Sequence, residues 1–185
     1  MKVLTIIPAR KGSKGIKNKN FLKIGQHTLL EHSCIFSKRL NFVEKTIISS
    51  DSSVAKKTAE RFNIFFSKRP KKFAMDNSLM IDLIRFEIKK NNTFTHVLIL
   101  QPTCPFRQIK HFIDAYKKFK KKEIDTAITV VKMKNHPSRM LVKRENFFKS
   151  YDKNFNFENR QDLEKIFLRS GSMYFFEINN IKRYR

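Results

Sequence analysis

Short apolar runs alternate with amphipathic stretches along most of the chain. The runs are rich in valine, isoleucine and leucine, which is typical of strands buried on both faces of a sheet. These predicted strands cover residues 3–7, 45–49, 64–66, 96–100, 126–131 and 173–178. Between them apolar residues recur at helical spacing, and the predicted helices cover residues 28–40, 54–62, 80–88 and 109–119.

Strands that alternate with helices of this length predict a mainly parallel α/β sheet with helices on both faces. Polar residues support two helix starts, because Thr28 can cap the first helix and the segment 50–52 can cap the second. The tail is less regular, with a predicted hairpin at 140–150 and a loop at 151–159. No repeat or linker divides the 185 residues, so we expect a single domain over residues 1–185.

The segment between the first strand and the first helix concentrates glycine and positive charge. Pro8 ends the strand because it cannot donate to a sheet ladder, and Gly12 and Gly15 are expected to allow turns that a Cβ would forbid. The cations of this basic loop are Arg10, Lys11, Lys14, Lys17 and Lys19. Such a loop typically holds nucleotide phosphates, although its spacing fits neither a Walker A loop nor a GxGxxG fingerprint.

Composition narrows the classes of protein further. The chain has 40 Lys and Arg against 16 Asp and Glu, but this net charge of +24 is spread along its whole length. A nucleic-acid-binding domain would gather the charge on one element, so we do not expect a nucleic-acid partner. No membrane helix or signal peptide is recognisable, so we expect a cytoplasmic protein without a membrane partner, with Cys34 and Cys104 reduced.

Ligands of parallel sheets bind outside the carboxyl ends of the strands. Three predicted loops leave such ends, at residues 10–20, 49–52 and 101–107. The sequence therefore predicts a ligand site that these loops form together. Asp51 and Asp76 lie in the same region, and each also has an ordinary explanation as a capping or turn residue.

The same segments carry a resemblance to a known family. Residues 9–20 read Ala-Arg-x-Gly-Ser-Lys-Gly-x-x-x-Lys-Asn, and residues 100–107 read Leu-Gln-Pro-Thr-Cys-Pro-Phe-Arg. Residues 69–77 begin with Arg-Pro and end with Asp-Asn, and weaker matches follow at 160–161 and 170–174. In this order the motifs resemble those of the CMP-sialic acid synthetases, the cytidylyltransferases that activate nonulosonic acids such as sialic, legionaminic and pseudaminic acid.

The resemblance implies a fold and a reaction. The fold would be a Rossmann-like, three-layer α/β/α nucleotidyltransferase sheet. The anomeric hydroxyl of a nine-carbon sugar acid would attack the α-phosphorus of CTP and expel pyrophosphate, which would supply a CMP-sugar acid for lipopolysaccharide or capsule synthesis. The chain would form a homodimer through a dimerisation insert at about residues 140–165.

Site residues are also carried over from the family. The nucleotide would be bound by Arg10, Gly12, Ser13, Lys14, Gly15, Lys19, Asn20 and Arg69, and the sugar acid by Gln101, Arg107, Arg160, Gln161 and Ser170. Arg10 and Lys19 would be the catalytic residues, because phosphoryl chemistry depends on charge neutralisation. Arg160 would pair with the sugar carboxylate in a bidentate fork. The alternatives are a solvated basic loop, surface arginines at 69 and 160, and a loop-bracing amide at 101.

One feature of the family is missing from the sequence. Its members bind catalytic Mg²⁺ through an Asp-x-Asp pair near the C-terminus, and this chain contains no Asp-x-Asp. The resemblance is therefore to a member shortened at its C-terminus, and Mg²⁺ is expected with unknown ligands. The alternatives are a non-catalytic CTP-binding remnant, a 3-deoxy-manno-octulosonate cytidylyltransferase, whose family lacks the first-loop pattern, and, more remotely, a basic nucleic-acid-binding domain.

Overall fold

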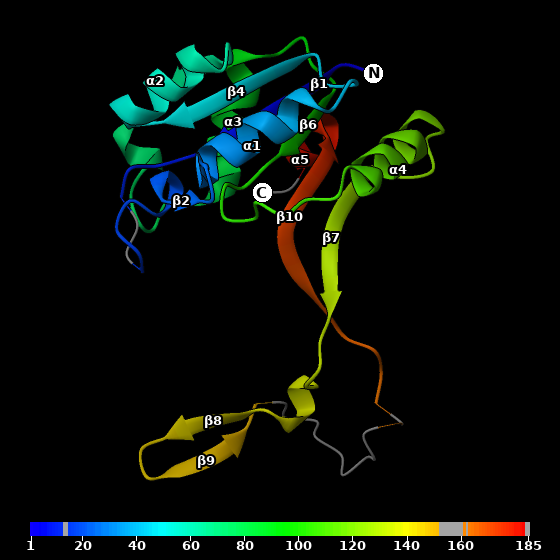
Figure 1. Ribbon diagram of the computed structural model, residues 1–185. Coiled ribbons are helices and arrows are strands. Elements are labelled where there is room, and N and C mark those ends of the chain that lie inside the picture. Colours follow the sequence, from blue (N-terminus) through cyan, green and yellow to red (C-terminus); the bar gives the residue numbers. More distant parts are fainter. Residues whose placement is uncertain (13–14, 152–160, 162, 184–185) are drawn as a thin grey trace. The chain divides into compact units, whose positions relative to one another are not determined.

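The computed structural model describes residues 1–12, 15–151, 161 and 163–183 (Figure 1). It divides into two compact units, one made of residues 1–129 with 171–185 and the other of residues 130–170. The expectation of a single domain is not tested by this division and stays a prediction.

The first unit is built on a six-stranded sheet with the order β5-β4-β1-β6-β10-β7. Its strands are β1 (Val3–Pro8), β4 (Lys45–Ser50), β5 (Phe65–Lys68), β6 (His96–Ile99), β7 (Thr126–Lys132) and β10 (Phe167–Glu177). The pairs β1–β4, β1–β6 and β4–β5 are parallel, whereas β10 runs antiparallel to β6. The predicted mainly parallel sheet is confirmed, although β10 begins at Phe167 rather than at Met173.

The parallel pairing of β1 with β4 and β6 determines which loops lie at the same end of the strands. In its parallel registers Pro8 lies opposite Ser49, and Ile6 lies opposite Ile99. The carboxyl ends of β1, β4 and β6 therefore emerge on the same edge, as the sequence predicts. The basic loop, the segment after β4 and the segment after β6 all leave the sheet there.

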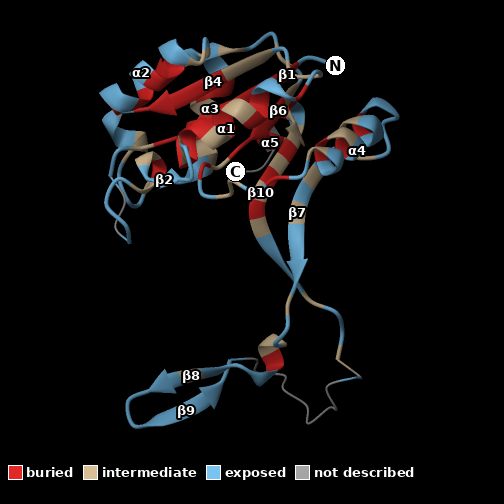
Figure 2. Cartoon of the chain, viewed as in Figure 1, coloured by how far each residue is buried: buried red, intermediate tan, exposed pale blue. Residues whose placement is uncertain are grey.

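Helices cover both faces of this sheet. They are α1 (Leu29–Lys38), α2 (Ser53–Arg61), α3 (Met80–Lys90), α4 (Ile109–Lys120) and α5 (Ile178–Arg183). Val3 and Ile7 of β1 belong to a buried cluster with residues of α1, α2 and α4, while Leu4 and Ile6 belong to another with residues of α3 and α5. Figure 2 shows buried residues along the central strands of the sheet. This alternation along β1 makes the three α/β/α layers that the resemblance implies.

The two predicted helix caps have different outcomes. Thr28 caps α1 through a capping box, because its hydroxyl accepts from the Glu31 amide at 3.2 Å and the Glu31 carboxylate accepts from the Thr28 amide at 2.8 Å. The N-cap of α2 is Ser52, but its side chain makes no capping hydrogen bond. The other two residues of that segment bond instead to the basic loop.

Several short elements were not expected from the sequence. They are η1 (Lys19–Phe21), β2 (Lys23–Ile24), β3 (His27–Thr28), η2 (Lys71–Phe73), η3 (Pro137–Arg139) and the helix α5. Each of the short helical turns and strands has at most three residues, too few for a periodic pattern to show.

The second unit contains the hairpin that the sequence predicts. Strands β8 (Leu141–Arg144) and β9 (Phe147–Ser150) are antiparallel, with Arg144 opposite Phe147. The turn has Glu145 at a φ of 45°. No helix of the described residues is long and apolar enough to span a membrane.

Candidate active site

The basic loop is tied to the end of β4 at its base. The Ala9 amide donates to the Ser49 carbonyl at 3.0 Å, and the Ser50 hydroxyl donates to the Ala9 carbonyl. The Lys11 amide donates to the Asp51 carboxylate at 2.7 Å. These contacts fix the direction in which the basic loop leaves the sheet.

Arg10 extends from this anchored base toward the loop that follows β5. Its guanidinium lies 2.8 Å from the Asp76 carboxylate and donates to the Ala74 carbonyl at 3.2 Å. The buried Asn20 holds the Arg10 backbone, since its side-chain amide donates to the Arg10 carbonyl at 3.1 Å. The Arg10 side chain is 29% exposed, so a solvent anion can still reach the oriented guanidinium.

Arg69 is a buried cation next to Arg10. It is 5% exposed, and its Nη2 donates to the Ser49 carbonyl at 2.9 Å. Among the described residues its Nε has no hydrogen-bond partner. Burial lowers the pKa of Arg69 to about 10, while Asp51 and Glu87 act in the opposite direction, so the guanidinium stays charged at neutral pH.

The two arginines line one cavity of about 200 Å³. Asp76 contributes a carboxylate, and Phe73, Met75 and Leu79 contribute apolar surface to the same cavity. Two guanidinium groups beside apolar side chains suit a ligand that combines an anionic group with a flat, partly apolar one.

The glycines of the basic loop do not have the role that the sequence suggests. Neither Gly12 nor Gly15 has a φ in the left-handed region, and a Cβ built on either would meet no described atom within 4 Å. The prediction that a Cβ would be forbidden there is therefore wrong. The open space beside both residues instead leaves room for a ligand to approach the backbone closely.

The remaining basic-loop residues are only partly described. Lys19 is half-buried at the start of η1, directly after Asn18, whose φ is 55°. Ser13 and Lys14, predicted to bind the nucleotide, lie outside the described residues. Of the cations in this loop, Arg10 and Lys19 are the two predicted to act in catalysis, and the structure describes both.

Arg107, predicted to bind the sugar acid, is buried and bonded to protein groups. It is 9% exposed, and its guanidinium donates to the carbonyls of Gln101 and Ser172 and, at 3.3 Å, to the Ser33 hydroxyl. Burial lowers the pKa of Arg107 to about 10. The side chain thus links α1, the loop after β6 and β10, which fixes the backbone of Gln101.

Gln101, which the sequence predicts to hydrogen-bond the sugar acid, follows the carboxyl end of β6. Gly171 packs against it, with a φ of +75° and an ideal Cβ position only 2.9 Å from the Gln101 Oε1. A side chain at position 171 would therefore displace Gln101 or distort β10. This close packing restricts the position of the Gln101 side-chain amide.

The other predicted sugar-acid residues lie outside the first unit or outside the described residues. Gln161 and Ser170 belong to the second unit, and Arg160 lies outside the described residues. Within its own unit Gln161 lines a cavity of about 470 Å³ together with Lys132, Lys134 and Arg139. The lining also includes Lys165 and Glu164, so cations outnumber carboxylates in it.

One polar group beneath the site was missed by the sequence analysis. Glu87 is fully buried and accepts from the hydroxyls of Ser49 and Ser67. A signal was present in the sequence, because Glu87 falls on the apolar face marked by Leu83 and Ile88. A glutamate at such a position requires partners from the strands beneath the helix.

The described residues do not provide a site for the Mg²⁺ that the resemblance implies. They contain no group of three His, Cys, Asp or Glu side chains placed to hold a metal ion. The two carboxylates near the basic loop are engaged, Asp51 with the Lys11 amide and Asp76 with Arg10. The donor set found here does not fit a metal site, and Mg²⁺ stays an expectation.

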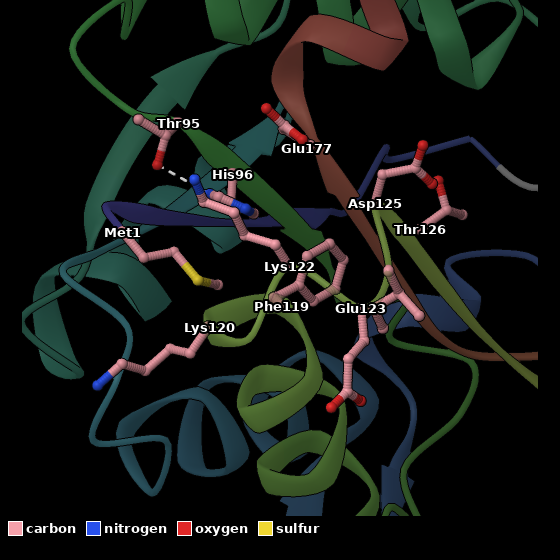
Figure 3. A pocket seen from close by; sticks show the side chains of 11 residues that line it. Met1, Thr95, His96, Phe119, Lys120, Lys122, Glu123, Asp125, Thr126 and Glu177 are labelled. Carbon is pink, nitrogen blue, oxygen red and sulfur yellow. Dashed lines mark hydrogen bonds between the residues drawn. The ribbon is translucent and has the colours of Figure 1, made fainter.

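A larger cavity of about 970 Å³ lies elsewhere in the first unit (Figure 3). It is lined by His96, Phe119 and Glu177 among others, with the Thr95 hydroxyl 2.8 Å from the His96 Nδ1. His96 begins β6, so this cavity is at the edge of the sheet opposite to the basic loop. In the described structure it contains none of the predicted site residues.

Comparisons with other sequences agree with the motifs. A family model described as cytidylyltransferase matches residues 4–185. The N-acylneuraminate cytidylyltransferase of Escherichia coli O18:K1:H7 is 32% identical over 140 residues, which cover 76% of this chain and 33% of that protein. The post-translational flagellin modification protein B of Campylobacter coli is 29% identical, covering 95% of this chain and 77% of that protein. The chain thus spans about a third of the first relative.

Solved structures share the fold at low sequence identity. The CMP:2-keto-3-deoxy-manno-octonic acid synthetase complexed with CTP superposes with a TM-score of 0.72 at 16% identity, covering 100% of this chain and 77% of that one. The 4-diphosphocytidyl-2C-methyl-D-erythritol synthase of Anaerococcus prevotii gives a TM-score of 0.65 at 16% identity, covering 99% of this chain and 74% of that one. At these identities the likeness shows the fold alone.

Proposed function

Because the chain belongs to the cytidylyltransferase family, we propose that it transfers the cytidylyl group of CTP to a nonulosonic acid and releases pyrophosphate. The names of relatives support this class of acceptor, since they include an N-acylneuraminate and a pseudaminic acid cytidylyltransferase. The product would be a CMP-sugar acid for cell-surface glycan synthesis.

The observation that carries the proposal is the pair of guanidinium groups, Arg10 and Arg69, at one cavity beside the basic loop. CTP supplies the matching chemistry, with a flat base and a chain of anionic phosphates. Arg10 is partly exposed and oriented by Asp76, so it can exchange part of that ion pair for a phosphate. Arg69 is buried and suits a fixed contact with the less mobile part of the nucleotide.

The chemical step mainly requires positioning and charge neutralisation. Attack by the anomeric hydroxyl on the α-phosphorus forms the new P–O bond, releases the hydroxyl proton to solvent and breaks the bond to the pyrophosphate group, whose leaving oxygens gain negative charge. Arg10 and Lys19 would stabilise that charge from the anchored basic loop, together with Ser13, Lys14 and the amides of Gly12 and Gly15. Asn20 contributes by holding the Arg10 backbone.

The sugar acid would bind on the side of β6. Gln101 would hydrogen-bond its hydroxyl or amide groups, and Arg107 would act by fixing the Gln101 backbone as well as by its charge. Arg160, Gln161 and Ser170 remain proposed contacts for the acid, with a guanidinium fork suited to its carboxylate.

We also propose that the chain forms a homodimer through the second unit. Its hairpin leaves Leu141, Phe147 and Phe148 exposed, at 63%, 50% and 64%. In the register of the hairpin Leu141 and Phe148 lie on one face and Phe147 on the other, so both faces expose apolar surface of the kind that another chain covers. Light scattering coupled to gel filtration tests this, and the triple replacement of these residues by serine should give a monomer.

Pyrophosphate release tests the proposed reaction. The full chain would be incubated with CTP, Mg²⁺ and a panel of acids that includes sialic, legionaminic, pseudaminic and 3-deoxy-manno-octulosonic acid. Turnover with one nine-carbon acid is expected and would identify the acceptor. Turnover with the eight-carbon acid alone would favour that enzyme class instead. Thermal stabilisation by CTP without turnover of any acid would make the chain a non-catalytic CTP-binding protein.

A further inference from the structure

Glu87 is a fully buried carboxylate on the otherwise apolar face of α3. Its relative exposure is 0%, and its neighbours on that face, Leu83, Ile84 and Ile88, are all buried in the core. Burying a carboxylate in such surroundings is costly, and an apolar residue of the same size would fill the space at lower cost. The position therefore calls for a role besides packing.

The carboxylate joins the carboxyl ends of two strands. Ser49 of β4 donates to Oε1 at 2.7 Å, and Ser67 of β5 donates to Oε2 at 2.9 Å. The two serines lie opposite each other in the parallel register of β4 and β5. Lys90 donates to the Ser67 hydroxyl at 2.8 Å and completes the chain of hydrogen bonds.

Ser49 connects this group to the cavity. Its backbone carbonyl accepts from Arg69 at 2.9 Å, while its hydroxyl donates to Glu87. The Nε of Arg69 is buried and has no partner in the described part of the chain. Two carboxylates favour the charged form of Arg69, and Asp51 has the larger effect on its pKa. Asp51 is exposed and bonded to the Lys11 amide, whereas Glu87 is fully buried, so Glu87 is the buried counter-charge of Arg69.

We propose that Glu87 is a positioning residue for the nucleotide, which through Ser49 and through its charge holds the Arg69 guanidinium at the cavity shared with Arg10. This inference rests on the proposed function, because Arg69 matters only if CTP binds there. Glu87 itself does not touch the cavity, whose lining includes Arg69 and Leu83 but not Glu87.

The first test replaces Glu87 by glutamine, which keeps the shape and removes the charge. Calorimetric titration with CTP, well below the unfolding temperature, should show a dissociation constant raised roughly five- to tenfold. Glu60→Gln, an exposed charge removal on α2, is the matched control and should bind CTP as the wild type does. Arg69→Lys with and without Glu87→Gln completes a double-mutant cycle, in which the second change should add little to the first.

A second pair of variants distinguishes a positioning role of Glu87 from a packing role. This test also works if Glu87→Gln does not fold. Ser49→Ala and Ser67→Ala each remove one hydrogen bond to the same carboxylate. Only at Ser49 does the lost bond also hold a backbone carbonyl that accepts from Arg69; the alanine keeps that carbonyl but releases it from Glu87. Both should lower the melting temperature, whereas only Ser49→Ala should weaken CTP binding, by about three- to fivefold.

The outcomes are distinguishable. Wild-type protein that does not bind CTP overturns the proposed function and this inference with it. Wild-type binding with an unchanged affinity in Glu87→Gln, or equal affinities in Ser49→Ala and Ser67→Ala, overturns this inference alone and leaves Glu87 as a packing residue. Full additivity of Arg69→Lys and Glu87→Gln likewise contradicts it, because Glu87 would then act independently of Arg69.

Discussion

Two buried arginines and a buried glutamate lie close to the ends of the strands, where apolar side chains would be cheaper to bury. Arg69 and Arg107 have pKa values lowered to about 10 by burial, and both still carry a charge at neutral pH. The Arg107 guanidinium donates to backbone carbonyls and to a serine hydroxyl. The buried Nε of Arg69, by contrast, has no hydrogen-bond partner in the described structure. The contacts of Arg107 brace the backbone at Gln101, whereas the buried Nε of Arg69 supports its proposed role as a nucleotide contact.

His96 gives a prediction on acid stability. Burial lowers its pKa below the usual 6.5, Glu177 acts in the opposite direction, and the N-terminal amine lowers it further. Since the folded state then binds this proton less readily than the unfolded state, the free energy of unfolding should fall as the pH falls below about 6.5. The loss should level off once the pH is below the folded pKa.

Denaturant unfolding at about pH 7.5 and about pH 5.5 measures this effect. His96→Gln should lose less stability on acidification than the wild type. The exposed His111→Gln serves as control and should behave as the wild type does. An equal loss in His96→Gln and wild type would contradict the account.

Gly171 gives a prediction on the close packing beside Gln101. Gly25 and Gly171 have similar φ values, +62° and +75°, but only at Gly171 would a Cβ meet a neighbour, the Gln101 amide at 2.9 Å. Gly25→Ala should therefore cost the backbone strain alone, about 1 kcal/mol in the free energy of unfolding, and Gly171→Ala about 1 kcal/mol more. Denaturant unfolding compares them, and equal costs would show that Gln101 yields freely.

At the scale of elements, the start of α1 tests how far local sequence determines a helix. Thr28→Ala removes the capping box with Glu31 and should lower the free energy of unfolding by about 1 kcal/mol. Ser52→Ala is the control, because Ser52 is the N-cap of α2 without a capping hydrogen bond, and should cost about half as much or less. Equal losses would mean that the capping bonds of Thr28 contribute nothing.

The elements of the first unit could be predicted because burial imposes a period on the sequence. The strands around β1 are buried on both faces and read as continuous apolar runs, and the amphipathic helices keep one apolar stripe. The short elements around the site could not be predicted, because the turn η1 and the β2–β3 ladder are each formed by only a few backbone hydrogen bonds. The helix α5 has six residues, too short for a helical period to be read.

The site itself was predictable in part. The strand ends that carry Arg10 and Gln101 follow from topology, and these residues lie there as predicted. The partners of the charges could not be predicted, because the contacts of Arg10 with Asp76 and of Glu87 with Ser49 join segments 66 and 38 residues apart in sequence. Such pairings depend on the register of the folded sheet.

For the whole molecule, the net charge of +24 requires that specific binding be separated from general attraction to anions. Association that depends on charge alone weakens steeply with salt and does not distinguish between polyanions. A site that reads the base as well as the phosphates keeps its preference for CTP as the salt rises. Because the cations are spread along the chain, we expect binding at the cavity of Arg10 and Arg69 to keep its preference for CTP as the salt rises.

The central claim is that this cavity and the basic loop bind CTP, and calorimetric titration of the folded chain tests it most directly. CTP should bind at one site per chain, more tightly than UTP or inorganic triphosphate, and with at least about tenfold lower affinity in Arg10→Ala. No binding of CTP by the folded chain, or equal, salt-sensitive binding of all three anions, would contradict the account.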